Sequence, residues 1–263
     1  MKHYYIDSIG AHLCYQELSG DDTPIVFIHG LGCASSSDYP AVVTIGKLNC
    51  HRRILIDLLG SGFSDKPYSF SYEINAHAGY LQEFLTDLGL EEFYLYAHSM
   101  GGAIALELTN LMQSKIKGII LSESNLDNGG GMFSQKVASM TETDYVSFGH
   151  EKLVSQNRIE SETSAICWSL SMNISLPQAI YRESISLING SNPSWREILY
   201  SLNIPKTYLF GSDSLPDDDL EKLPLHGVKV DIIPDAGHSM AWENSTGLAL
   251  AIANAIGSKS SNT

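Results

Sequence analysis

The stretch Tyr94-Leu95-Tyr96-Ala97-His98-Ser99-Met100-Gly101-Gly102 decides the fold, because an apolar strand runs directly into a serine and small residues surround it. A serine presented at the tip of a sharp strand-to-helix turn has a strained backbone, and bulky side chains two positions away would collide across that turn. Ala97 and Gly101 occupy those positions, in a variant of the pattern G-x-S-x-G. The stretch therefore predicts a strand, a turn that presents the Ser99 hydroxyl, and a helix that begins after Ser99.

Short, nearly continuous apolar runs lie on both sides of this stretch, as is typical of strands buried on both faces of a sheet. Helical patterns lie between several of them, and two alternating segments near the start of the chain predict a hairpin. This alternation predicts an α/β fold with a mostly parallel central sheet and helices on both faces. The strand segments are 3–7, 11–18, 24–29, 53–58, 93–97, 116–121, 206–210 and 228–233, and the helical ones are 74–88, 100–111 and 243–256.

The segment 128–202 breaks the alternation, because it contains no convincing buried strand and is rich in aromatic residues and methionine. A helical insertion late in an α/β sheet predicts a cap, or lid, over a site in the core, which then comprises 1–127 and 203–263. Cap residues are the candidates for a substrate pocket, although each could instead pack the cap onto the body. The candidate pocket residues are Cys33, Phe133, Tyr145, Trp168 and Met172.

The bulk composition bounds the class of protein. The 263 residues fit one α/β domain with a sizeable insertion. A formal charge of −14 argues against nucleic acid and anionic membranes as partners and leaves a small-molecule substrate as the expected one. No apolar run approaches the roughly 18 residues that span a bilayer, and the first residues lack the pattern of a signal peptide. We therefore expect a soluble, cytoplasmic protein, whose oligomeric state the sequence does not indicate.

The four cysteines, Cys14, Cys33, Cys50 and Cys167, are scattered and show no C-x-x-C pair or zinc spacing. This usage is typical of a reducing compartment, where free cysteines behave as small apolar residues. We therefore predict no metal site, and expect Cys33 to be a packed thiol.

A serine hydroxyl is a weak nucleophile at neutral pH unless a histidine takes its proton. His238 follows the last predicted strand in Pro234-Asp235-Ala236-Gly237-His238, which places it at the same carboxyl edge of the sheet as Ser99. His98 is expected to point into the sheet. In His29-Gly30-Leu31-Gly32-Cys33 the glycines let the backbone curl, so the N–H groups of Leu31 and Met100 are the candidate donors of an oxyanion hole.

These three motifs, in this order, resemble the α/β-hydrolase family, and the segment from Asp57 to Pro67 resembles that family's D-x-x-G-x-G-x-S-x-x-P. The resemblance covers about residues 24–256 and leaves the cap without a recognisable signature. It implies acyl transfer to water through an acyl-serine intermediate, with no cofactor. The resemblance also supports the interpretation of 128–202 as a cap.

The acid that would orient His238 has two candidates. In most members of the family it follows the penultimate strand, three residues after a terminal glycine, whereas Asp213 stands two residues after Gly211. Glu123, at the end of the strand before the cap, resembles the acid of other branches, the haloalkane dehalogenases among them. We favour Glu123 and keep Asp213 as the alternative.

The sequence thus predicts a serine hydrolase, most simply a carboxylic-ester hydrolase on a small, largely apolar acyl substrate. Hydrolysis of a carbon–carbon bond, a lactone, a thioester or an amide remains open, as does a receptor that binds a ligand without turnover. Dehalogenation is not expected, because Ser99 stands where the dehalogenases have an aspartate.

Overall fold

A computed structural model of the chain describes residues 1–159 and 163–257. Its centre is an eight-stranded sheet in the order β1-β2-β4-β3-β5-β6-β7-β8, in which the β1–β2 and β2–β4 pairs are antiparallel and the remaining pairs are parallel. The predicted hairpin and mostly parallel sheet are confirmed. The strands are β1 (Lys2–Ile6), β2 (Ala11–Leu18), β3 (Asp22–Ile28), β4 (His51–Asp57), β5 (Phe93–His98), β6 (Ile116–Ser122), β7 (Lys206–Gly211) and β8 (Lys229–Ile233).

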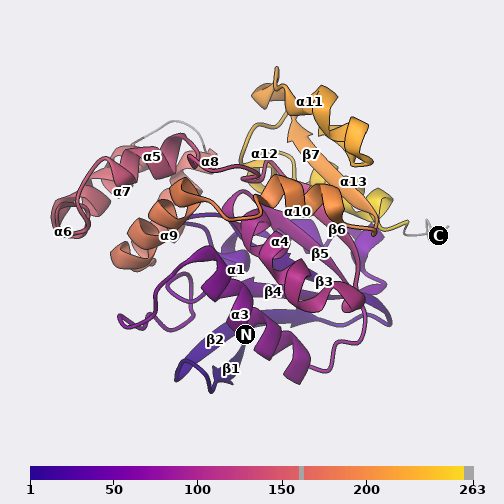
Figure 1. Cartoon of the computed structure of the whole chain (residues 1–263), viewed down its shortest axis with the longest axis horizontal. Coiled ribbons are helices and arrows are strands. Elements are labelled where there is room, and N and C mark those ends of the chain that lie inside the picture. The colour runs from indigo at the N-terminus through magenta and orange to yellow at the C-terminus, as the bar shows by residue number, and fades with distance from the viewer. Residues whose placement is uncertain (160–162, 258–263) are drawn as a thin grey trace.

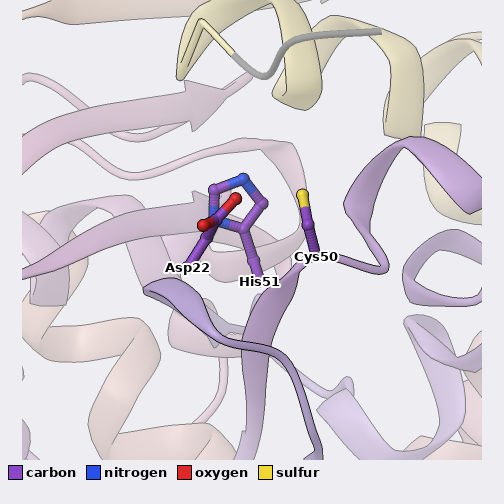
Figure 2. A group of neighbouring side chains, drawn as sticks. All are labelled: Asp22, Cys50 and His51. Atoms are coloured by element: carbon purple, nitrogen blue, oxygen red, sulfur yellow. The ribbon is translucent and has the colours of Figure 1, made fainter. Parts of the chain in front are cut away.

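The parallel strands give the sheet two chemically different edges. At the carboxyl edge β5 ends directly before Ser99, β6 ends directly before Glu123, and the loop after β8 carries His238. At the amino edge the start of β3 and the start of β4 bring together Asp22, Cys50 and His51 (Figure 2). The two groups of polar residues therefore adjoin different strands and lie at opposite edges of the sheet.

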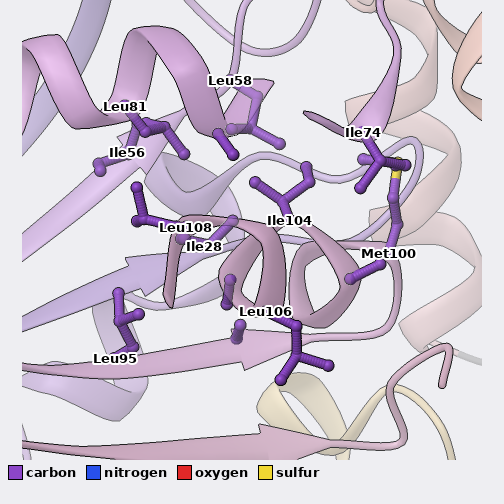
Figure 3. Close-up of a cluster of buried hydrophobic side chains, with 14 of the residues drawn as sticks. Ile28, Ile56, Leu58, Ile74, Leu81, Leu95, Met100, Ile104, Leu106 and Leu108 are labelled. Carbon is purple, nitrogen blue, oxygen red and sulfur yellow. The ribbon is translucent and has the colours of Figure 1, made fainter. Parts of the chain in front are cut away.

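Helices cover both faces of the sheet (Figure 1). On one face α3 (Ile74–Asp87) and α4 (Met100–Met112) pack against each other and against the strands. Figure 3 shows the apolar side chains that meet there, with Leu81 from α3, Ile104 and Leu108 from α4, and Ile28 and Leu95 from the sheet. The other face is covered by α2 (Pro40–Val43) and α13 (Ser245–Ala255).

Several short helices have no counterpart in the sequence analysis. Each is about one turn long, and so few residues cannot display a period of 3.6. They are α1 (Ser35–Asp38), α2, α11 (Asp219–Lys222), α12 (Met240–Glu243), the 3₁₀ segments η1 (Gly46–Leu48), η2 (Gln113–Lys115), η4 (Ser212–Ser214) and η5 (Leu223–His226), and the π turn η3 (Tyr145–Gly149).

Between β6 and β7 the described residues form helices and loops, which agrees with the helical pattern of the sequence. Figure 1 shows α5, α7, α8 and α9 together at one side of the sheet, whereas α10 lies against α4. These helices are α5 (Met132–Ala138), α6 (Glu142–Asp144), α7 (His150–Arg158), α8 (Thr163–Asn173), α9 (Pro177–Asn189) and α10 (Trp195–Ser201). Within the described residues, no helix has the length and apolar character needed to cross a membrane.

Candidate active site

Ser99 occupies a strained turn between β5 and α4. Its backbone has φ 53° and ψ −123°, a region that side chains other than glycine rarely adopt. Its N–H donates to the carbonyl of Ser122 at 3.0 Å, and its own carbonyl accepts from Gly102 N–H at 2.9 Å. The strain is thus held by the neighbouring strand and by the first turn of α4, as the sequence predicts for this turn.

The reason for the small residue at position 101 differs in part from the one expected. A Cβ on Gly101 would lie 2.5 Å from the carbonyl oxygen of His29, so the constraint comes from the end of β3 rather than from across the turn. A Cβ on Gly30 would likewise lie 3.1 Å from the Cβ of Ser99. Glycine at these two positions lets the loop after β3 approach Ser99.

His238 and Glu123 meet at this edge. Nδ1 of His238 donates to Oε2 of Glu123 at 2.8 Å, and Gly211 N–H donates to the other carboxylate oxygen at 2.9 Å. Burial alone would raise the pKa of Glu123, but the hydrogen bonds from His238 and Gly211 and the charge of His238 hold this pKa below its usual value. Glu123 is therefore a carboxylate at neutral pH, and it fixes the proton on Nδ1 of His238.

Asp213, the alternative acid, points elsewhere. It lies exposed in η4, where its Oδ1 accepts a hydrogen bond from the hydroxyl of Ser212 at 2.9 Å. Its backbone N–H donates to the carbonyl of Ala236 at 2.9 Å, which helps to hold the loop before His238. The geometry therefore brings Glu123, and not Asp213, to His238.

His98 does not point into the sheet as expected, but lies beside His238, with 4.6 Å between the ring centroids. Its Nδ1 is 3.1 Å from the carbonyl oxygen of Ser122. Burial, followed by the charge of His238, lowers the pKa of His98 to about 3. His98 is thus a neutral ring that packs against His238. Neither the hydroxyl of Ser99 nor Nε2 of His238 makes a hydrogen bond within the described residues, a common state for such pairs without substrate.

The loop of Leu31 is held by two residues that the sequence analysis did not single out for this purpose. His29 is fully buried, accepts from Leu58 N–H on Nε2 at 3.0 Å and donates from Nδ1 to the carbonyl of Gly30 at 2.8 Å. The indole N–H of Trp168 donates to the carbonyl of Leu31 at 3.1 Å. The N–H groups of Leu31 and Met100 have no acceptor within the described part of the chain, so both remain available.

The pocket candidates divide into two groups. Cys33 and Trp168 line a small cavity together with His98 and His238, and Phe133 packs edge-on against Trp168 with 4.6 Å between centroids. Met172 is buried beneath Gly32. Tyr145, by contrast, packs inside the insertion, where its hydroxyl lies 3.1 Å from Nδ1 of His150.

A carboxyl group that no sequence pattern indicated also lines this cavity. Asp38 is buried, and its Oδ1 accepts from the indole N–H of Trp242 at 3.2 Å. Burial raises its pKa to about 7, against the opposing effect of hydrogen bonds from Cys33 and Trp242. Burial, followed by the negative charge and hydrogen bond of Asp38, raises the pKa of the Cys33 thiol.

Comparison with known proteins matches most of the chain to a family. The family model described as alpha/beta hydrolase fold matches residues 23–245. The human mesoderm-specific transcript homolog protein is 31% identical over 137 residues, which are 51% of this chain and 38% of that protein. Haloalkane dehalogenase 2 of Mycobacterium tuberculosis is 26% identical over 121 residues, 46% of this chain and 41% of that protein. The matches thus span about two fifths of the length of these curated relatives.

Solved structures resemble the fold over nearly the whole chain. A thermophilic esterase from Thermogutta terrifontis has a TM-score of 0.80 at 19% identity, covering 97% of this chain and 98% of its own. The N-acyl homoserine lactonase AidH has a TM-score of 0.76 at 18% identity, covering 100% and 98%. At such identities these structures share the fold alone. Because the family model covers most of its length, the chain belongs to the α/β-hydrolase fold family.

Proposed function

We propose that the protein is a serine hydrolase that cleaves carboxylic esters. The observation that carries the proposal is the 2.8 Å pair of His238 and Glu123 at the edge of the sheet that also presents the strained Ser99. A carboxylate on Nδ1 leaves Nε2 as the basic nitrogen of His238, which is the tautomer a serine nucleophile requires.

The proposed reaction has two half-steps. The hydroxyl oxygen of Ser99 attacks the ester carbonyl while His238 takes its proton, and Glu123 stabilises the resulting imidazolium. The N–H groups of Leu31 and Met100 donate to the oxyanion, and each such donor contributes roughly 3–4 kcal/mol of transition-state stabilisation in other enzymes. The alcohol leaves with the proton from His238. Water, activated by the same histidine, then releases the acid from Ser99.

A small, largely apolar acyl group is the substrate class we propose. Support comes from the helical insertion, which we interpret as the cap, because Trp168 reaches the Leu31 loop from α8 and Phe133 packs against Trp168. Cleavage of a lactone or an amide would use the same residues. A panel that adds an N-acyl homoserine lactone and an anilide to p-nitrophenyl esters of increasing length separates these reactions.

Labelling with a fluorophosphonate probe tests the proposal. We expect the wild-type protein to be labelled and to cleave p-nitrophenyl esters, and Ser99→Ala to lose both properties. Ser139→Ala is the matched control and should leave both unchanged, because Ser139 is exposed on the insertion and its hydroxyl donates to the carbonyl of Lys136. Ester cleavage that persists in Ser99→Ala would reject the assignment. Ligand binding without turnover across the panel would favour a receptor.

A further inference from the structure

The amino edge of the sheet carries a cluster unrelated to the site above. A nitrogen of His51, the sulfur of Cys50 and a carboxylate oxygen of Asp22 all lie within 4.8 Å of one another. Figure 2 shows the three side chains gathered on one side of the strand starts. Among the described residues, this is the one group of three or more His, Cys, Asp or Glu side chains with its ligand atoms so close.

The backbone beneath the cluster is fixed by the sheet. Asp22 pairs with His51 in the register of β3 and β4, and its N–H donates to the carbonyl of Cys50 at 2.9 Å. A Cβ on Gly20 would lie 2.6 Å from the Cys50 carbonyl oxygen and would collide with the backbone of His51. Glycine at position 20 therefore lets the two segments that carry the cluster approach closely.

Arg53 forms hydrogen bonds to both of these segments. Its guanidinium donates to the side-chain oxygen of Asn49 at 2.8 Å and to the carbonyl of Ser19 at 2.5 Å. These bonds join the residues just before Cys50 to the residues just before Asp22. The three ligand-bearing positions are thus preorganised, and only side-chain rotation is needed to bring their atoms closer.

The ring of His51 is oriented in the way that metal-binding histidines usually are. Nδ1 lies 2.7 Å from the carbonyl oxygen of Thr23 and donates to it. A backbone carbonyl in this position fixes both tautomer and ring orientation, and such partners strengthen metal binding. Thr23 would therefore be the supporting residue of the site.

The chemistry of the donor set also favours a cation. A dication between the thiol and the carboxylate would bind the thiolate and release the thiol proton. One sulfur, one imidazole nitrogen and one carboxylate oxygen form a donor set that suits Zn²⁺, whereas Mg²⁺ and Ca²⁺ prefer oxygen ligands.

We propose that Asp22, Cys50 and His51 bind one Zn²⁺ ion, with water as the fourth ligand. Metal–ligand bonds of about 2.0–2.3 Å in a tetrahedral site place ligand atoms about 3.3–3.8 Å apart. Because the three ligand atoms lie within 4.8 Å of one another, the exposed side chains of Asp22 and Cys50 need to close by at most about 1.5 Å. The ion cross-links the start of β3 and the start of β4. It lies at the opposite edge of the sheet from Ser99, so its role is structural.

A titration of the reduced, tag-free, metal-free full chain with Co²⁺ tests the proposal. We expect one equivalent to produce a thiolate-to-cobalt charge-transfer band, and Zn²⁺ to displace it. The band should disappear in Cys50→Ser and Asp22→Asn and persist in Cys167→Ser, a control that removes another partly exposed thiol. Zn²⁺ at a hundredfold excess over its Kd should raise Tm by about 5 °C in the wild type and leave fluorophosphonate labelling of Ser99 unchanged.

Three results would overturn the site. The first is the absence of a band at one equivalent, and the second is a band that survives Cys50→Ser, which would mean that a different thiolate binds the cobalt. The third is a band that survives Asp22→Asn or is lost in Cys167→Ser, because the ligand set would then be a different one. None of these outcomes depends on the proposed esterase activity, so the two proposals fail separately.

Discussion

Oε2 of Glu123 lies 2.8 Å from Nδ1 of His238, although the two residues are 115 positions apart in the chain. The strand between them in the sheet, β7, holds the carboxylate in place, because Gly211 N–H donates to its second oxygen at 2.9 Å. The last residue of β7 thus contributes a backbone donor. The carboxylate itself comes from the residue directly after β6.

Replacement of Glu123 by glutamine should lower kcat by about 10³–10⁴, because an uncharged amide neither fixes the proton on Nδ1 of His238 nor stabilises the imidazolium. Asp213→Asn is the matched control and should change kcat by less than about twofold. Steady-state hydrolysis of a p-nitrophenyl ester measures both. A large loss in Asp213→Asn with little change in Glu123→Gln would reverse the assignment.

A pair of glycine variants tests the packing around Ser99. Gly101→Ala places a methyl group 2.5 Å from the His29 carbonyl, so we expect it to cost about 1–3 kcal/mol of stability and to reduce fluorophosphonate labelling. Gly79 lies inside α3, where an added methyl group would have open space around it in the described part of the chain, so Gly79→Ala should stabilise by about 0.5–1 kcal/mol and leave labelling unchanged. Urea unfolding and labelling rates measure these effects. Equal behaviour of the two variants would contradict the assigned packing.

The sequence predicted the parts of the fold whose physics is local. Each buried parallel strand is a short apolar run, and the turn at Ser99 needs small neighbours, so both leave a pattern that one sequence displays. Strand order then places Ser99, Glu123 and His238 at one edge. The contact of His238 with Glu123 rather than Asp213 was predictable, because a one-residue offset changes the direction of the Asp213 side chain.

Contacts between segments that are distant in the chain have no local sequence pattern from which they could be predicted. Asp38 and Trp242 are joined by a hydrogen bond although they lie 204 positions apart in the chain, and neither position belongs to a motif. Asp22 and Cys50 form no recognisable ligand spacing, because the two come from different strand starts. Tyr145 was a reasonable pocket candidate by residue type, but its direction depends on the packing of the insertion.

Trp168→Phe should weaken the proposed oxyanion hole without unfolding the protein. The variant keeps an aromatic ring beside Phe133 but removes the donor to the Leu31 carbonyl. Such a bond is worth about 0.5–1.5 kcal/mol, so kcat/KM should fall about two- to thirteenfold. Trp195→Phe removes a comparable indole donor, to Glu107 at 2.9 Å, away from the site. We expect this control to lower Tm and leave kcat/KM unchanged. Equal losses of kcat/KM in both variants would refute a role for Trp168 in holding the loop.

The contact between the insertion and the body contains a buried acid. Glu183 of α9 is fully buried, and its Oε1 lies 3.1 Å from Nε2 of His77 in α3. Within the described residues, neither carboxylate oxygen has a well-aligned hydrogen bond. Burial raises the pKa of Glu183 well above its usual value and lowers that of His77 to about 3, so both side chains are neutral in the folded protein at mildly acidic pH.

Glu183→Gln should therefore stabilise the protein increasingly as pH rises. Below about pH 4.5 the folded and unfolded states both hold the Glu183 proton, so the pKa difference contributes nothing. Above about pH 4.5, Glu183 ionises first in the unfolded state. The free energy of unfolding of the wild type then falls by about 1.4 kcal/mol per pH unit until the folded carboxyl also ionises, and the glutamine variant has no such loss. Urea unfolding at pH 4, 6 and 8 measures this, with exposed Glu151→Gln as the control. The depressed pKa of His77 acts in the opposite direction, because its contribution to the free energy of unfolding is lost as pH falls from about 6.5 towards 3. This contribution is common to the wild type, Glu183→Gln and Glu151→Gln. A difference between Glu183→Gln and wild type that does not change with pH would show that Glu183 is not held protonated by burial.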